Sequence, residues 1–99
     1  MGNPLSRYSV VVAVKDLVSC ELAGEMVILH LKDGIYYGLN PVGTRIWNLI
    51  QEPRTVEEIR GVLLREYDVE EERCGRDLFM LLQELADKGL IEVKNETVV

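Results

Sequence analysis

Side chains that commonly carry catalysis or bind metals are few and scattered in this chain of 99 residues. The single histidine, His30, lies among apolar neighbours, and no serine stands in a G-x-S-x-G turn that would raise a nucleophile. Cys20 and Cys74 are 54 positions apart, so two thiols and one imidazole lack the fourth ligand and the close spacing of a zinc site. We therefore expect two reduced, largely buried thiols and no metal.

The glycines and acidic residues have structural explanations. Gly24, Gly34, Gly38 and Gly43 match neither common spacing of a phosphate-binding loop. Acidic residues cluster where helices are expected to start, and carboxylates are favoured at the positive end of a helix dipole. The sequence therefore predicts a protein that is not an enzyme and that needs no cofactor.

The charge is unevenly distributed along the chain. Eleven basic and seventeen acidic residues give a net charge of −6, and all of this excess lies in residues 51–99. Nucleic-acid binding relies on lysine and arginine at phosphates, so this balance disfavours it. No apolar run approaches the roughly 20 residues that span a bilayer, and the N-terminus lacks the basic-then-apolar order of a signal peptide. We expect a cytoplasmic protein without membrane contact.

The first half alternates with a period of two, which is typical of β-strands. Apolar alternation covers residues 10–14, 17–22, 26–31 and 35–39. Asp33-Gly34 is a strong hairpin signal, because glycine tolerates the positive φ that such turns require. We expect an antiparallel sheet over this half, ending in a meander whose third strand is residues 35–39.

The period changes to that of a helix at Asn40. Asn40 is a good helix cap, Pro41 suits the first turn, and Pro53 ends the helix. Thr55 and Glu58 have the spacing of a capping box, which predicts the start of a second helix.

A third helix is expected from about Val69 to Lys88, with Gly89 in the left-handed position just beyond its end. Its core stripe is Cys74, Leu78, Leu81, Leu82 and Leu85. Residues 91–93 alternate briefly as a closing strand. The chain is thus expected to form one domain over residues 1–99, with a core at about 8–93. The fold class is α+β: a small antiparallel three-stranded sheet packed on three helices, with a winged-helix outline.

Three of the six aromatic residues, Tyr36, Tyr37 and Trp47, lie close together in residues 33–47. On the strand, Tyr37 shares the core-facing side with its i±2 neighbours, so Tyr36 points outward, where an exposed aromatic ring can serve a partner. From periodicity alone, the favoured explanation is that all three rings simply pack the sheet against the helices.

The order of these motifs resembles the PqqD-like family. Within residues 34–47 the chain reads glycine, two tyrosines, Leu-Asn, a glycine and Ile-Trp. Residues 55–59, 67–69 and 88–91 continue the resemblance, which covers about residues 17–93. Members of this family, also called RiPP recognition elements, bind the leader segment of a ribosomally made precursor peptide and present it to modifying enzymes.

The resemblance implies that the leader adds as a further strand along the third strand, in the cleft beside the third helix. An exposed strand edge is physically suited to this role. The accepting strand consists of Ile35, Tyr36, Tyr37, Gly38 and Leu39. Gly38 departs from the family, in which a bulky or polar residue is more usual, and its missing side chain either opens a pocket or loosens the strand.

The helical wall of the cleft is predicted from the third helix. Gly75 and Phe79 lie on one flank of its buried stripe, with Arg76 and Gln83 at the rim. Phe79 is a large apolar group where a solvated flank would be polar, so we expect this flank to face the cleft. The alternative is that Phe79 packs on a neighbouring helix.

Within the family, a free-standing chain of this size is most similar to the leader-binding partner in lasso-peptide biosynthesis, which works with a leader peptidase and a cyclase. One alternative is the PqqD-type carrier of the precursor peptide of pyrroloquinoline quinone (PQQ), which serves a radical enzyme. A different class is a winged-helix DNA-binding regulator, with Arg73 and Arg76 toward phosphates. The exposed strand edge also permits a homodimer or a role as a scaffold subunit.

Overall fold

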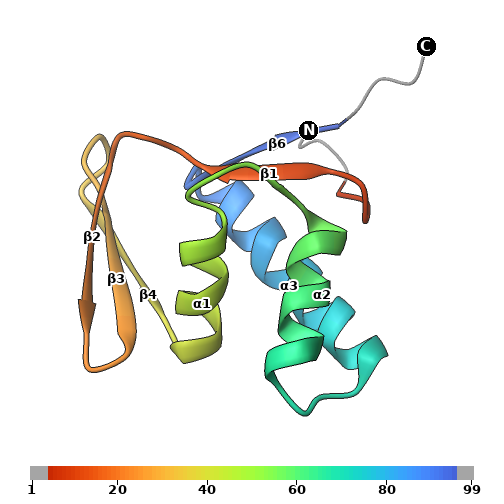
Figure 1. The fold of residues 1–99 in the computed structure, drawn as a ribbon. Helices are drawn as coiled ribbons and strands as arrows, with labels where there is room; N and C mark the ends of the chain where they lie inside the picture. The colour runs from red at the N-terminus through yellow and green to blue at the C-terminus, as the bar shows by residue number, and fades with distance from the viewer. Residues whose placement is uncertain (1–4, 96–99) are drawn as a thin grey trace.

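The computed structural model describes residues 5–95, which form three helices and two three-stranded antiparallel sheets (Figure 1). In chain order the elements are β1 (Val10–Ala13), β2 (Leu17–Leu22), β3 (Glu25–His30), β4 (Ile35–Leu39), α1 (Pro41–Leu49), β5 (Arg54–Thr55), α2 (Val56–Glu66), α3 (Glu71–Asp87) and β6 (Ile91–Lys94). None of the helices in this part of the chain is long and apolar enough to cross a membrane.

Strands β2, β3 and β4 form the meander that the sequence predicts, in the order β2-β3-β4. Ala23 and Gly24 turn the chain between β2 and β3 with positive φ angles of 53° and 82°. Gly34 turns it between β3 and β4 with a φ of 67°. One face of this sheet contributes buried residues such as Ile28 and Leu39 to the core, while the other face is largely exposed.

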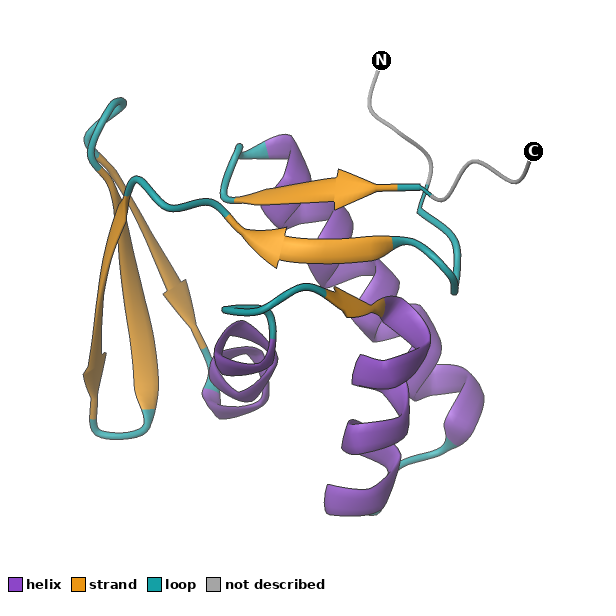
Figure 2. Cartoon of the chain, turned by 45° about the horizontal axis from the view of Figure 1, so that its top comes forward, coloured by secondary structure: helices purple, strands orange, loops and turns teal. Residues whose placement is uncertain are grey.

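The second sheet has the order β5-β1-β6, and it corrects one expectation from the sequence. Residues 10–14 alternate like a strand of the meander, but β1 pairs instead with β6, from Val10↔Lys94 to Ala13↔Ile91. Figure 2 shows this sheet apart from β2-β3-β4. The partner strand lies about eighty residues further along the chain, so no local pattern reports the pairing.

The helix boundaries follow the predicted caps. The Oδ1 atom of Asn40 accepts a hydrogen bond from the Gly43 N–H at 2.8 Å. Thr55 and Glu58 form a complete capping box at the start of α2. Gly89, with a φ of 74°, ends α3 as predicted. Helix α1 ends at Leu49, before the proline that we expected to end it.

Helix α1 lies between the β2-β3-β4 sheet and the other two helices (Figure 1). Thr44, which is buried, links it to this sheet: its Oγ1 accepts from the Met26 N–H at 2.9 Å and donates to the Leu39 carbonyl at 3.4 Å. On the other side, Arg45 of α1 donates two hydrogen bonds of 2.8 Å to the carboxylate of Glu66. Helix α1 therefore holds the edge of the sheet at a fixed position relative to α2.

Candidate functional site

Strand β4 is an edge strand of its sheet. It pairs with β3 from Met26↔Leu39 to His30↔Ile35, and no other strand of residues 5–95 pairs with it. In an antiparallel edge strand, alternate residues direct their N–H and C=O groups away from the sheet. Strand β4 therefore offers a row of backbone donors and acceptors that an added strand can use.

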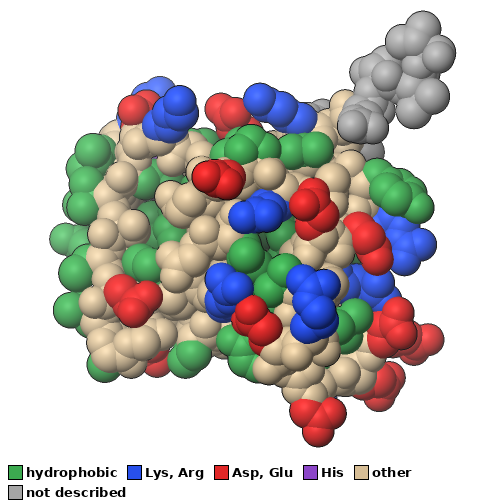
Figure 3. Space-filling view, viewed as in Figure 1, with side chains coloured by type: hydrophobic (Ala, Val, Ile, Leu, Met, Phe, Trp, Pro, Cys, Tyr) green, Lys and Arg blue, Asp and Glu red, His purple; other side chains and the backbone are tan. Residues whose placement is uncertain are grey.

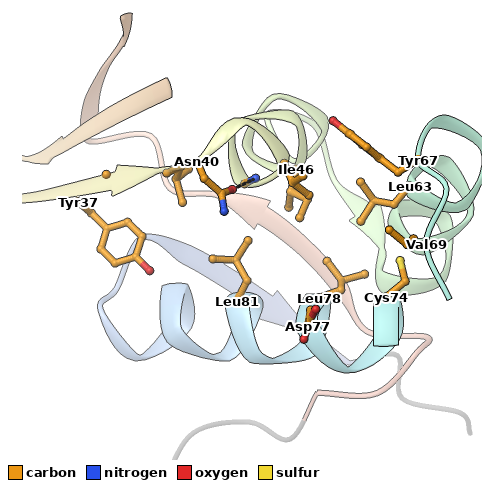
Figure 4. Close-up of a pocket in the computed structure, with 14 residues that line it drawn as sticks. Tyr37, Asn40, Ile46, Leu63, Tyr67, Val69, Cys74, Asp77, Leu78 and Leu81 are labelled. Carbon is orange, nitrogen blue, oxygen red and sulfur yellow. Dashed lines mark hydrogen bonds between the residues drawn. The ribbon is translucent and has the colours of Figure 1, made fainter. Parts of the chain in front are cut away.

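A cavity of about 420 Å³ lies directly beside this edge, between β4 and the three helices (Figure 4). Most of its lining is apolar. The lining residues are Tyr37, Gly38, Leu39, Asn40, Val42, Gly43, Ile46, Leu63, Tyr67, Val69, Cys74, Asp77, Leu78 and Leu81. We call this cavity the β4–α3 groove.

The start of α1 forms the floor of the groove, and Gly43 allows it to lie close to β4. A Cβ atom on Gly43 would come within 3.2 Å of the Leu39 side chain and 3.3 Å of the Asn40 Oδ1. Contacts this short would push the helix away from the strand. The Asn40 cap and Gly43 together thus let the chain pass from the edge strand into the helix within one residue.

Tyr37 spans the groove at one end, pointing from β4 toward α3 (Figure 4). The Glu84 carboxylate of α3 interacts with its hydroxyl, and the Lys88 Nζ lies 5.5 Å from its ring centroid. Burial, followed by the interaction with the Glu84 carboxylate, raises the pKa of Tyr37 to about 12. The phenol is therefore neutral at physiological pH, and it connects the sheet to α3.

The five predicted strand residues form β4 with the expected alternation, and three of them, Tyr37, Gly38 and Leu39, line the groove. Leu39 is buried, Tyr37 is half-buried and faces the groove, and Tyr36 points outward with 70% of its surface exposed. Ile35 is exposed although it shares a side with Tyr37, since it lies at the end of β4 far from α1.

The structure does not bring the four predicted α3 residues to this groove. A Cβ on Gly75 would face Arg60 of α2, at 3.5 Å from its Nε. Phe79 and Gln83 line a separate hollow with Leu5. Arg76 is exposed and does not line the groove either.

Helix α3 instead lines the groove with Cys74, Asp77, Leu78 and Leu81. Helical periodicity predicts Leu81 only as part of the core stripe, and no sequence pattern predicts a role for Asp77. The buried stripe of α3 has a flank on each side, and periodicity does not show which flank faces β4. That depends on where the neighbouring elements lie in the fold.

No group of three or more potential metal ligands occurs among the described histidine, cysteine, aspartate and glutamate residues. Cys74 is buried, and burial raises the pKa of its thiol, so this sulfur packs as a small apolar group. Cys20 is exposed on β2, contrary to the expectation that both thiols are largely buried. Cys20 is exposed because β2 is an edge strand and its outer face is open to solvent.

Comparison with known proteins identifies the fold and its family. Residues 25–91 match the family model described as coenzyme PQQ synthesis protein D (PqqD). The chain belongs to the PqqD family. This membership confirms the resemblance seen in the motifs of residues 34–47 and in the later helices.

Two solved structures are similar to this PqqD-family chain. The first, TbiB1 in complex with the TbiA(beta) leader peptide, is 41% identical with a TM-score of 0.76, and the match covers 82% of this chain and 94% of TbiB1. The second, lasso peptide synthetase B1 complexed with the leader peptide, has a TM-score of 0.73 over 83% of this chain and 96% of its own. Its identity of 22% shows the shared fold alone. No curated protein sequence is significantly similar to the chain.

Proposed function

We propose that this PqqD-family protein binds the leader of a ribosomally made precursor peptide, which adds as a fourth strand to the sheet at β4. The observation that carries the proposal is the open edge of β4 beside an apolar groove. The complex of the 41% identical TbiB1 with a leader peptide supports it. The protein performs no catalysis itself and acts in the cytoplasm, where its precursor peptide is made.

Strand addition divides the recognition between backbone and side chains. Hydrogen bonds to β4 supply affinity for any extended peptide, and side-chain pockets supply the specificity. Because side chains alternate along a strand, one set of leader side chains enters the β4–α3 groove and the other set lies on the outer face of the sheet. Leu78 and Leu81 of α3 and Ile46 of α1 form the apolar wall that the first set meets.

The bound leader is delivered to a leader peptidase and a cyclase in lasso-peptide biosynthesis. Binding through the leader raises the effective concentration of the core peptide at these enzymes, without new contacts to the core itself. The added strand also fixes the direction in which the core peptide leaves the groove.

A second candidate lies within the same class. The matching family model is described as a PQQ synthesis protein, which favours a carrier of the PQQ precursor peptide for a radical enzyme. The identity of the peptide that binds distinguishes the two, because both use the same edge of β4.

Fluorescence anisotropy tests the proposal with three labelled probes at one salt concentration. They are the TbiA(beta) leader peptide, the leader peptides encoded beside the gene of this protein, and a random DNA duplex. We expect saturable binding of a lasso-type leader and none of DNA. Failure of every leader to bind, together with salt-sensitive DNA binding, would overturn the proposal in favour of a winged-helix regulator.

A further inference from the structure

Gly38, the fourth of the five residues of β4, is a glycine that the fold itself does not require. Gly24, Gly34 and Gly89 have positive φ angles, and Gly43 has close neighbours. At Gly38 the φ is not positive, and an added Cβ would have no atom within 4 Å.

A glycine inside a strand weakens it, and it often marks a position that a ligand approaches closely. Nothing within the described chain fills the space at Gly38, so an explanation for this glycine lies in what binds on that side of the sheet.

The backbone of Gly38 borders the β4–α3 groove, but a Cβ atom at this position would project to the outer, solvent-facing side of the β2-β3-β4 sheet, as that of Tyr36 does. The register aligns Gly38 with Val27 and Cys20 across the sheet, and none of these residues is charged. The adjacent aligned row is Tyr36, Leu29 and Val18. Apolar side chains gather over this sheet at the left of Figure 3, while charged side chains are concentrated over the helices.

The result is a gap at the edge of an apolar surface. Tyr36, two positions before Gly38 on the same side of β4, is 70% exposed and stands beside the gap. Val27, which is half-buried, lies directly opposite Gly38 on the neighbouring strand β3. A ring or a long aliphatic group placed over Gly38 would contact both of these side chains.

A leader strand paired with β4 places such a side chain there. Residues directly opposite each other on neighbouring strands project to the same face, with Cβ atoms about 4.5–5.5 Å apart. The leader residue opposite Gly38 therefore projects to the outer face, where Gly38 has no side chain to compete with it.

We infer that Gly38 and Tyr36 form a subsite on the outer face of β4 for one large apolar side chain of the leader, best filled by an aromatic ring. The inference rests on the proposed function. It adds a second specificity site, on the opposite face of the sheet from the β4–α3 groove.

The test combines Gly38→Val with an alanine scan of the leader. The probe is the TbiA(beta) leader peptide, or the leader that binds most tightly among those encoded beside the gene. Valine favours a strand, and its Cβ enters open space, so the variant should fold with an unchanged circular dichroism spectrum. Cys20→Val is the matched control, because it adds the same side chain to the same row at the other edge of the sheet.

We expect Gly38→Val to weaken leader binding by about tenfold, as a branched side chain takes the space of a buried anchor. At one leader position, replacement by alanine should lower the affinity for the wild-type protein by about tenfold. The same leader variant should lower the affinity for the Gly38→Val protein by less than about twofold, because substitutions at two contacting sites are not additive. Cys20→Val should bind as the wild type does.

Three results would overturn the inference. In the first, Gly38→Val binds as tightly as the wild type; in the second, it lowers the affinity of every alanine variant by the same factor. Either leaves the proposed function standing if the wild-type protein binds the leader. In the third, the wild-type protein binds no leader, and the proposed function then fails as well.

Discussion

The Tyr37 side chain connects strand β4 to α3, and the pKa of its phenol is sensitive to this contact. Its pKa is raised from 10.0 to about 12 by burial and by Glu84. The folded chain therefore holds the phenol proton more tightly than the unfolded chain does. The resulting stabilisation is fully present below pH 10 and is lost as the pH rises toward 12.

We expect a tyrosinate absorbance titration to show one phenol that ionises near pH 12. Tyr37→Phe should remove this late step and flatten the fall of the free energy of unfolding between pH 10 and pH 12. Glu84→Gln should lower the pKa of Tyr37 only in part, because burial is the larger cause. A Tyr37→Phe protein that keeps the late step would contradict the assignment.

Thr44 is a second residue whose role is visible only in the structure. Its hydroxyl accepts from the Met26 N–H and is buried between α1 and the sheet. Thr44→Val keeps the shape but removes this acceptor, so we expect the free energy of unfolding to fall by about 1–3 kcal/mol. Urea denaturation measures this change. Thr44→Ser, which keeps the hydroxyl, should lose about 1 kcal/mol or less for the missing methyl group.

The elements themselves divide into those that the sequence predicts and those that it does not. The caps at Asn40 and Thr55 and the left-handed Gly89 depend on neighbours within a few residues, so local patterns predict the starts of α1 and α2 and the end of α3 correctly. The sheet of β1, β5 and β6 joins the two ends of the domain. Its strands can be recognised locally, but their pairing cannot.

The same distinction applies to the site. Strand β4 and the outward direction of Tyr36 follow from alternation, and the structure has both. The flank of α3 that lines the groove depends on where β4 and α2 lie around the helix. Helical periodicity predicts the buried stripe but not which neighbouring element covers each side of it. For this reason Phe79, rather than Leu81, was predicted to line the groove.

Paired substitutions on α3 test the assignment of the groove wall. Leu81→Ala removes an apolar contact from the β4–α3 groove, and we expect leader affinity to fall by at least about tenfold, since burying a leucine side chain is worth about 1.5–3 kcal/mol. Phe79→Ala, in the separate hollow, should change affinity by less than about twofold. Anisotropy titrations of the folded variants give both values. If Phe79→Ala instead caused the larger loss, the opposite flank of α3 would be the wall.

At the scale of the whole molecule, the β2-β3-β4 sheet is joined to the helical body mainly through α1, and the groove lies where the two parts face each other. Thr44 fixes the sheet to α1 and Arg45 fixes α1 to α2. This arrangement keeps β4 at the side of α3 without pairing its outer edge. An edge strand held in this way is preformed for a peptide, which lowers the entropic cost of binding.

The central claim is that a leader peptide pairs with the free edge of β4. Amide hydrogen exchange, measured by NMR on the labelled protein with and without an unlabelled leader, tests it most directly. Strand β2, the other edge of the same sheet, is the internal control. We predict slower exchange at alternate residues of β4 on binding and unchanged exchange in β2. Saturated binding that protects β2, or that leaves β4 unchanged, would contradict the claim.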